Sequence, residues 1–143
     1  MQDLSPCNVD PAERITRYIL DKRYFNPETG KITVKAFLPH TPKLPGSPEI
    51  QTSVYRTMDC EETEIWSIGD DYVANPKAKP KRFVLARGDL EAETVFSQDL
   101  KIVPHPTPHK RHANIVNWPT EGNRELQEMK AVELAKKARL VTR

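Results

Sequence analysis

The chain has 143 residues and nearly balanced charge, with 22 Lys and Arg residues against 20 Asp and Glu residues. This length suits one compact domain, and the balance excludes a strong whole-protein field for nucleic acid or anionic lipid. No segment reaches the roughly 20 apolar residues that span a bilayer, and the start has no basic stretch followed by an apolar run, so we expect a cytoplasmic protein outside the membrane.

A helix is the first predicted element, beginning at Asp10 and ending near Leu20. Asp10 is a helix-capping residue, Pro11 stands at the first helical position, and Glu13 follows three residues after the cap. Residues 1–9 are expected to be flexible. The buried face of the helix is expected to carry Ile15, Tyr18 and Ile19.

Two strands are predicted next, at 31–38 and 50–56, on either side of a proline-rich loop at 39–48. In the first strand, apolar residues such as Ile32 and Val34 alternate with polar ones, which is the period of a strand with one buried face. The second is rich in β-branched and aromatic residues.

A short helix is predicted after Asp59, where a cap residue is followed three positions later by a glutamate. Gly69 is expected to end this helix in a left-handed conformation, and Trp66 to cover the sheet. A proline-rich connection at 75–81 then leads to a third strand at 82–86.

The last third of the chain predicts short strands and the longest helix. Residues 88–97 fit a short helix, with a strand inside them as the alternative. Thr120 is expected to cap a helix that runs to about Leu140. The strand candidates are 94–96, 101–103 and 113–118.

This order of elements predicts a single α+β domain over residues 1–143. We expect a mostly antiparallel or mixed sheet of about four to five strands. The sheet would pack with an N-terminal helix, short central helices and a long C-terminal helix.

The segment 104–112 is the predicted functional region, because it combines a proline-rich loop at 104–109 with clustered imidazoles. A polyproline helix has about three residues per turn, so the side chains of His109 and His112 are expected to point in the same direction. The chain would have to bend for the side chain of His105 to join them. Their spacing matches no known metal motif, and Cys7 and Cys60 have no ligand spacing either, so neither a metal nor a cofactor is predicted.

Anion recognition is the first functional hypothesis, since cations stand beside these histidines. The protein would then be a binding or accessory protein without catalysis. Its partner would be an unidentified anionic ligand or another protein. The predicted surface comprises Arg56, Arg87, Lys110, Arg111 and His112.

The alternative is a small hydrolase or transferase that acts on a phosphate-containing substrate. His112 or His109 would be the acid or base, and Arg56 or Arg111 would hold the anion. An enzyme needs these groups to converge in a concave site, whereas a binding protein presents them on an open face. The sequence leaves open which of the two applies.

Nucleic-acid binding is a further alternative, at a second basic stretch with Tyr72 and Phe83 nearby for base stacking. Exposed basic connections are usually only solvated, so the sequence does not favour it. The stretch contains Lys77, Lys79, Lys81, Arg82 and Arg87.

Four stretches of the chain form a recognisable set: TSVYR at 52–56, EIWSIG at 64–69, ARGDL at 86–90 and RHANIVNWP at 111–119. With them the chain resembles a family of small uncharacterised bacterial proteins. The resemblance covers most of the chain after Lys31. It implies a bacterial cytoplasmic protein and carries no catalytic role.

Overall fold

The computed structural model describes residues 5, 8–40, 50–119 and 122–143. Most of the segment predicted to be flexible, most of the loop predicted at 39–48, and the predicted cap Thr120 therefore lie outside the described residues.

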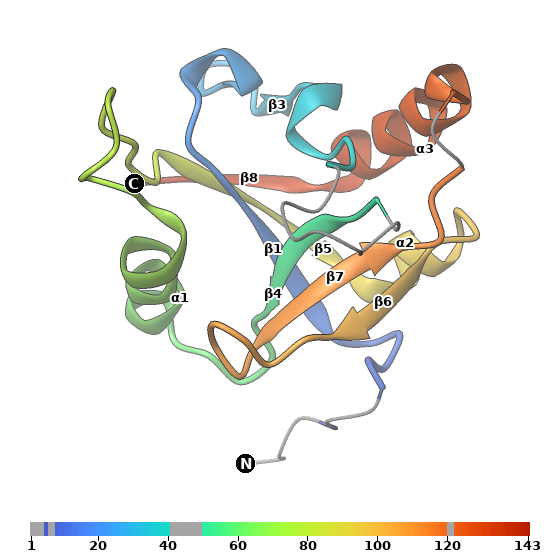
Figure 1. Ribbon diagram of the computed structural model, residues 1–143, viewed down its shortest axis with the longest axis horizontal. Coiled ribbons are helices and arrows are strands. Elements are labelled where there is room, and N and C mark those ends of the chain that lie inside the picture. Colours follow the sequence, from blue (N-terminus) through green and yellow to red (C-terminus); the bar gives the residue numbers. More distant parts are fainter. Residues whose placement is uncertain (1–4, 6–7, 41–49, 120–121) are drawn as a thin grey trace.

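The described chain is built on a six-stranded antiparallel sheet with the strand order β6-β7-β4-β1-β5-β8 (Figure 1). A separate two-stranded ribbon pairs β2 with β3. The predicted α+β class is confirmed, with six strands in the sheet instead of four or five. The strands are β1 (Arg14–Ile19), β2 (Phe25–Asn26), β3 (Lys31–Ile32), β4 (Thr52–Arg56), β5 (Ala86–Glu91), β6 (Lys101–Pro104), β7 (His112–Val116) and β8 (Arg139–Thr142).

Three α-helices and three further helical turns accompany the sheet in the described residues. Figure 1 shows α1 and α3 on opposite sides of β1. The helices are α1 (Glu62–Ile68), α2 (Ala92–Phe96) and α3 (Arg124–Lys137), and the turns are η1 (Lys22–Tyr24), η2 (Val34–Ala36) and η3 (Gly69–Val73). None of the described helices is both long enough and apolar enough to cross a bilayer.

One face of the sheet is apolar and holds the main core, with α2, α3 and η2 packed on it. Ile15 and Ile115 from the sheet and Leu134 from α3 are all 0% exposed. Burying each such side chain contributes about 1.5–3 kcal/mol, so this face is a major source of hydrophobic stabilisation.

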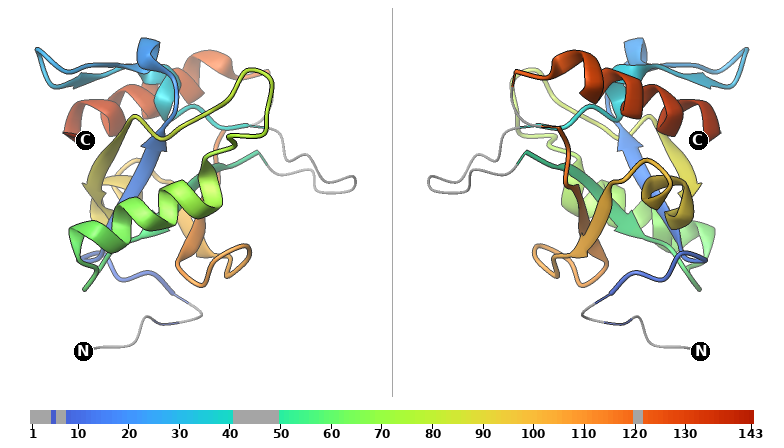
Figure 2. Two further views of the ribbon diagram at one scale, coloured as in Figure 1. Left: turned by 90° about the vertical axis from the view of Figure 1, so that its left-hand side faces the viewer. Right: turned by 90° about the vertical axis from the view of Figure 1, so that its right-hand side faces the viewer.

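The other face of the sheet, which we call the polar face, is covered in part by α1 and η3. Tyr18 and Tyr55 project from it against Ile65 and Ile68. A Cβ atom on Gly69 would lie only 2.7 Å from Cε1 of Tyr18, so this position needs glycine for the helix to approach the ring. Figure 2 shows α1 crossing in front of the strands in its left view.

The predicted N-terminal helix is wrong, because the chain makes one turn and then enters β1. The cap forms as predicted, with the Asp10 backbone N–H donating to Oε2 of Glu13 at 2.7 Å. However, β1 lies inside the sheet and is buried on both faces, with Ile15 and Thr16 at 0% exposure. In such a strand polar and apolar residues do not alternate strictly. The apolar residues Ile15, Tyr18 and Ile19 therefore have the same spacing as the buried face of a helix.

Other boundaries also differ from the predictions. The strand predicted at 31–38 pairs only over Lys31–Ile32 before the turn η2. The strand predicted at 82–86 lies at Ala86–Glu91, and the short helix therefore starts only at Ala92. Strand pairing with β1 and β8 on both sides decides this register.

The ends of two predicted helices are also corrected. Gly69 has φ −61°, so it is right-handed and continues the helix into η3. The long helix is confirmed but ends at Lys137, since the residues from Arg139 pair with β5 as strand β8. The strands predicted at 50–56, 101–103 and 113–118 are confirmed with small shifts.

Candidate functional site

The candidate site lies on the polar face, where β4 and β7 run side by side. The antiparallel register places Ser53 opposite Asn114 and Tyr55 opposite His112. Because side chains alternate along a strand, these four all project to the same face. The pairing therefore brings together residues that are far apart in the sequence.

Two hydrogen bonds in series connect Ser53, His112 and the backbone of His105. Oγ of Ser53 lies 2.6 Å from Nε2 of His112, and Nδ1 of His112 lies 2.9 Å from the carbonyl oxygen of His105. A carbonyl oxygen only accepts, so Nδ1 carries the proton and donates it. Nε2 is then left to accept the hydrogen bond from the Ser53 hydroxyl.

Burial favours the neutral form of His112. The residue is only 7% exposed, and this burial is the largest influence on the pKa of the imidazole, which it lowers. Hydrogen bonding to the backbone of His105 and Thr107 raises the pKa in part, while the charge of the nearby His105 ring lowers it. Ser53 is half-buried and His105 is exposed, so the site is reached from solvent on that side. A neutral imidazole hydrogen-bonded to a serine hydroxyl can act as a general base.

The other two histidines of the segment 104–112 lie close to His112. The ring of His105 contacts that of His112 at a centroid distance of 5.3 Å. His109 lies against Tyr72 at 4.9 Å and faces Tyr55 at 6.5 Å. These ring contacts hold the loop between β6 and β7 against η3 and the sheet. Within the described ranges, no three His, Cys, Asp or Glu side chains are grouped so as to hold a metal ion.

Two arginines of the predicted anion-binding surface are buried in ion pairs. Arg56 projects from the opposite face of β4 to Tyr55, is 2% exposed, and donates two hydrogen bonds of 2.8 Å to Glu13. Arg87 is 1% exposed on the polar face, where it donates to Glu62 and stacks on Trp66. Both guanidinium groups therefore have internal partners.

The remaining members of that surface lie at the start of β7. Arg111 is 9% exposed and donates to the carbonyl oxygen of Met58 at 2.9 Å. Lys110 is exposed. The structure thus keeps Lys110, Arg111 and His112 together and places Arg56 on the other side of the sheet.

Ser53 and Asn114 were missed by reasoning from the sequence. The available signal was limited to spacing: Ser53 and Tyr55 are two residues apart in a predicted strand, and so are His112 and Asn114 at the start of another, but the sequence did not predict that these strands pair. Asn114 is 6% exposed, and its Oδ1 makes no hydrogen bond with any described residue. It adds an amide beside the Ser53 hydroxyl.

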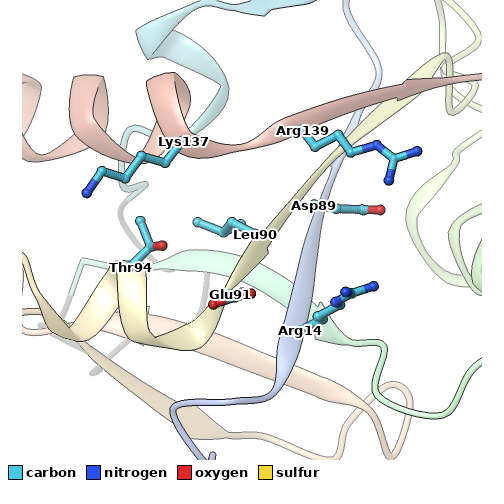
Figure 3. Close-up of a pocket in the computed structure, with 7 residues that line it drawn as sticks. All are labelled: Arg14, Asp89, Leu90, Glu91, Thr94, Lys137 and Arg139. Atoms are coloured by element: carbon cyan, nitrogen blue, oxygen red, sulfur yellow. The ribbon is translucent and has the colours of Figure 1, made fainter.

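A hollow of about 290 Å³ at the end of β5 and β8 has mixed charge. Figure 3 shows Arg14, Asp89 and Arg139 pointing to the same side, whereas Lys137 points away from them. Glu91 adds a second carboxylate to the lining. Since the two carboxylates offset most of the cationic charge, this hollow is not selective for anions.

The second predicted basic stretch is divided in space. Arg87 is buried on the polar face, while the lysines and Arg82 are exposed. Lys79, Lys81 and Arg82 line an open hollow of about 660 Å³ together with Phe83.

Comparisons with known proteins return no match to a family model, to a curated protein or to a solved structure. The resemblance to small bacterial proteins therefore stays a prediction. Any functional assignment must rest on the geometry of this chain.

Proposed function

We propose that this protein is a small hydrolase or transferase in which Ser53 is the nucleophile and His112 is the general base. The observation that carries the proposal is the pair of hydrogen bonds from Ser53 Oγ through His112 to the His105 carbonyl, at 2.6 and 2.9 Å. The same relay of hydroxyl, imidazole and acceptor activates serine nucleophiles on unrelated folds.

The chemistry follows from the proton positions. Nε2 of His112 takes the hydroxyl proton as Oγ of Ser53 attacks the carbonyl carbon or phosphorus of an ester. The bond to the leaving alkoxide breaks, and the imidazolium returns the proton to that oxygen. A water molecule, or an acceptor alcohol in a transferase, then releases the group from Ser53 by the same steps.

Neighbouring groups are suited to support this reaction. The carbonyl of His105 holds the ring of His112 in one tautomer and stabilises the imidazolium that forms. Asn114 faces Ser53 across the strand pair, and a side-chain amide is a typical donor to a developing oxyanion. Exposed Lys110 is the cation available for a phosphate-bearing substrate.

This proposal keeps His112 as the acid or base that the sequence suggested and replaces the other partners. His109 becomes a packing residue against Tyr55 and Tyr72. Arg56 is not used, since it holds Glu13 on the opposite face of the sheet. The proposed setting is the cytoplasm of a bacterium, on the strength of the resemblance described above.

The test is covalent labelling with a fluorophosphonate, which reacts with activated serines. We expect one adduct, located on Ser53 by peptide mass spectrometry and absent from Ser53→Ala. His112→Gln should slow labelling by about a hundredfold or more. Ser67→Ala, which alters an exposed serine on α1, is the matched control and should label normally. The proposal would be overturned if Ser53 is not labelled, or if His112→Gln labels at the same rate as the wild type.

A further inference from the structure

The open hollow at one end of the sheet is formed by two segments that are distant in the sequence. One is Leu20–Arg23, directly after β1, and the other is the connection from Asn75 to Leu85 before β5. Paired backbone hydrogen bonds of 2.9 and 3.0 Å between Asn75 and Arg82 close that connection into a hairpin. A third, from the Leu85 N–H to the Ile19 carbonyl at 2.9 Å, ties it to β1. These two segments form the two rims of the hollow, which has a volume of about 660 Å³.

The charge of this hollow, which we call the basic hollow, is strongly positive. One carboxylate, Asp21, lies in the lining, and it is paired with Arg23 at 2.7 Å. None of the other four cations forms an ion pair with a carboxylate in the part of the chain that the structure describes. The lining therefore has five cations against one carboxylate, a larger excess of positive charge than the net +2 of the whole chain. The cations of the basic hollow are Lys22, Arg23, Lys79, Lys81 and Arg82.

The basic hollow also exposes apolar surface among its cations. Phe83 is 54% exposed and Leu85 is 38% exposed, both in its lining. Phe83 belongs to neither of the two hydrophobic clusters of the described residues, so its ring is available to a ligand. Such a ring is the usual platform on which an unpaired base stacks.

We infer that the basic hollow binds single-stranded nucleic acid, with the cations along both rims contacting phosphates and Phe83 stacking on a base. A duplex fits less well, because its bases are already stacked and unavailable to Phe83. An acidic peptide would use the cations but would leave the aromatic ring without a partner. This inference is independent of the Ser53 site, since none of the same side chains is involved.

The test is fluorescence anisotropy with a labelled oligouridylate of about 12 nucleotides, a length within the usual site size for single strands. We expect binding at about 50 mM salt that weakens steeply by about 200 mM, with a slope of about −0.7 for each phosphate contact. A duplex of the same length and polyglutamate serve as comparison ligands. Circular dichroism establishes that each variant is folded.

Three variants locate the site. Lys79→Gln, Lys81→Gln and Arg82→Gln together should weaken binding at low salt by about tenfold or more and flatten the salt dependence. The matched control removes three exposed lysines elsewhere, Lys31→Gln, Lys35→Gln and Lys101→Gln, and should bind normally. Phe83→Ala should weaken binding to the single strand by about fivefold or more while leaving binding to the duplex unchanged.

Four results would overturn the inference. The first is that the oligouridylate does not bind at low salt, and the second is that the test and control triple variants lose the same amount of affinity. The third is that Phe83→Ala does not change the affinity for the single strand. The fourth is that polyglutamate or the duplex binds as tightly as the single strand. Each of these outcomes leaves the labelling of Ser53 as an independent measurement.

Discussion

Arg56 and Glu13 form a two-pronged ion pair in which Nε and Nη2 of the arginine each donate to a different carboxylate oxygen at 2.8 Å. The side chains are 2% and 7% exposed. Arg56 also donates to the carbonyl oxygens of Ser5 and Asn8, so it attaches the N-terminal segment to the sheet. This pair explains why a residue that looked like an anion-binding arginine is structural.

Removing one partner of this pair should be costly. Glu13→Ala leaves a buried guanidinium without its carboxylate, and we expect the free energy of unfolding to fall by about 3–5 kcal/mol. Urea unfolding followed by circular dichroism measures this. The double variant Glu13→Leu with Arg56→Met should recover much of the loss, because it removes both charges. A double variant no more stable than Glu13→Ala would contradict this account.

Gly69→Ala tests the close approach of η3 to Tyr18. The added methyl carbon would lie 2.7 and 2.8 Å from two ring atoms, and we expect a loss of about 1–3 kcal/mol, which outweighs the gain of about 1 kcal/mol in helix propensity. Combining it with Tyr18→Leu should restore part of the loss. Gly30→Ala is a useful comparison. Its added methyl group would contact no atom within 4 Å, so its only cost in stability comes from the backbone φ of +72°. Greater stability of Gly69→Ala would contradict the predicted overlap.

The lowered pKa of His112 predicts a loss of stability in acid. Above the ordinary pKa of 6.5 the imidazole is neutral in both folded and unfolded chains, so it has no effect there. As the pH falls below 6.5 the unfolded chain takes up a proton first, and the free energy of unfolding declines until the folded pKa is reached. Tyr55, Ser53 and His105 face the ring, and none of them supplies a compensating negative charge.

The measurement is urea unfolding of the wild type and His112→Gln between about pH 7.5 and 5, the window in which an imidazole with a lowered pKa titrates. The variant should show a smaller dependence on pH. His109 also has a lowered pKa and contributes equally to both proteins, so the difference isolates His112. Identical slopes would show that His112 is not buried as a neutral base.

Cys60 should react slowly with alkylating agents. Burial raises the pKa of its thiol from 9.0 to about 11, which leaves about a hundredfold less thiolate at pH 8. In a Cys7→Ser background, iodoacetamide labelling of the folded protein should be slower than that of N-acetylcysteine by about that factor. Labelling should become fast in denaturant, and equal rates in the folded state would refute the prediction.

Some elements could be predicted from the sequence because they depend on neighbouring residues. The helical spacing of Ala131, Leu134 and Ala135 is local, and α3 forms where it was expected. The capping turn at Asp10 is local too, and its hydrogen bonds form. That turn did not extend into a helix, because the residues after it are paired on both sides in the sheet, a competition that no local pattern reveals.

The sequence by itself determined that this is an α+β protein with balanced charge, a long C-terminal helix and a proline-rich run of histidines. The tertiary structure alone decided which side chains those histidines contact. Ser53 meets His112 across 59 positions of the chain because the register of β4 against β7 puts them on one face, and Arg56 points away because it stands at the alternate position. Strand register depends on side-chain packing over the whole sheet, so no local pattern in the sequence contains it.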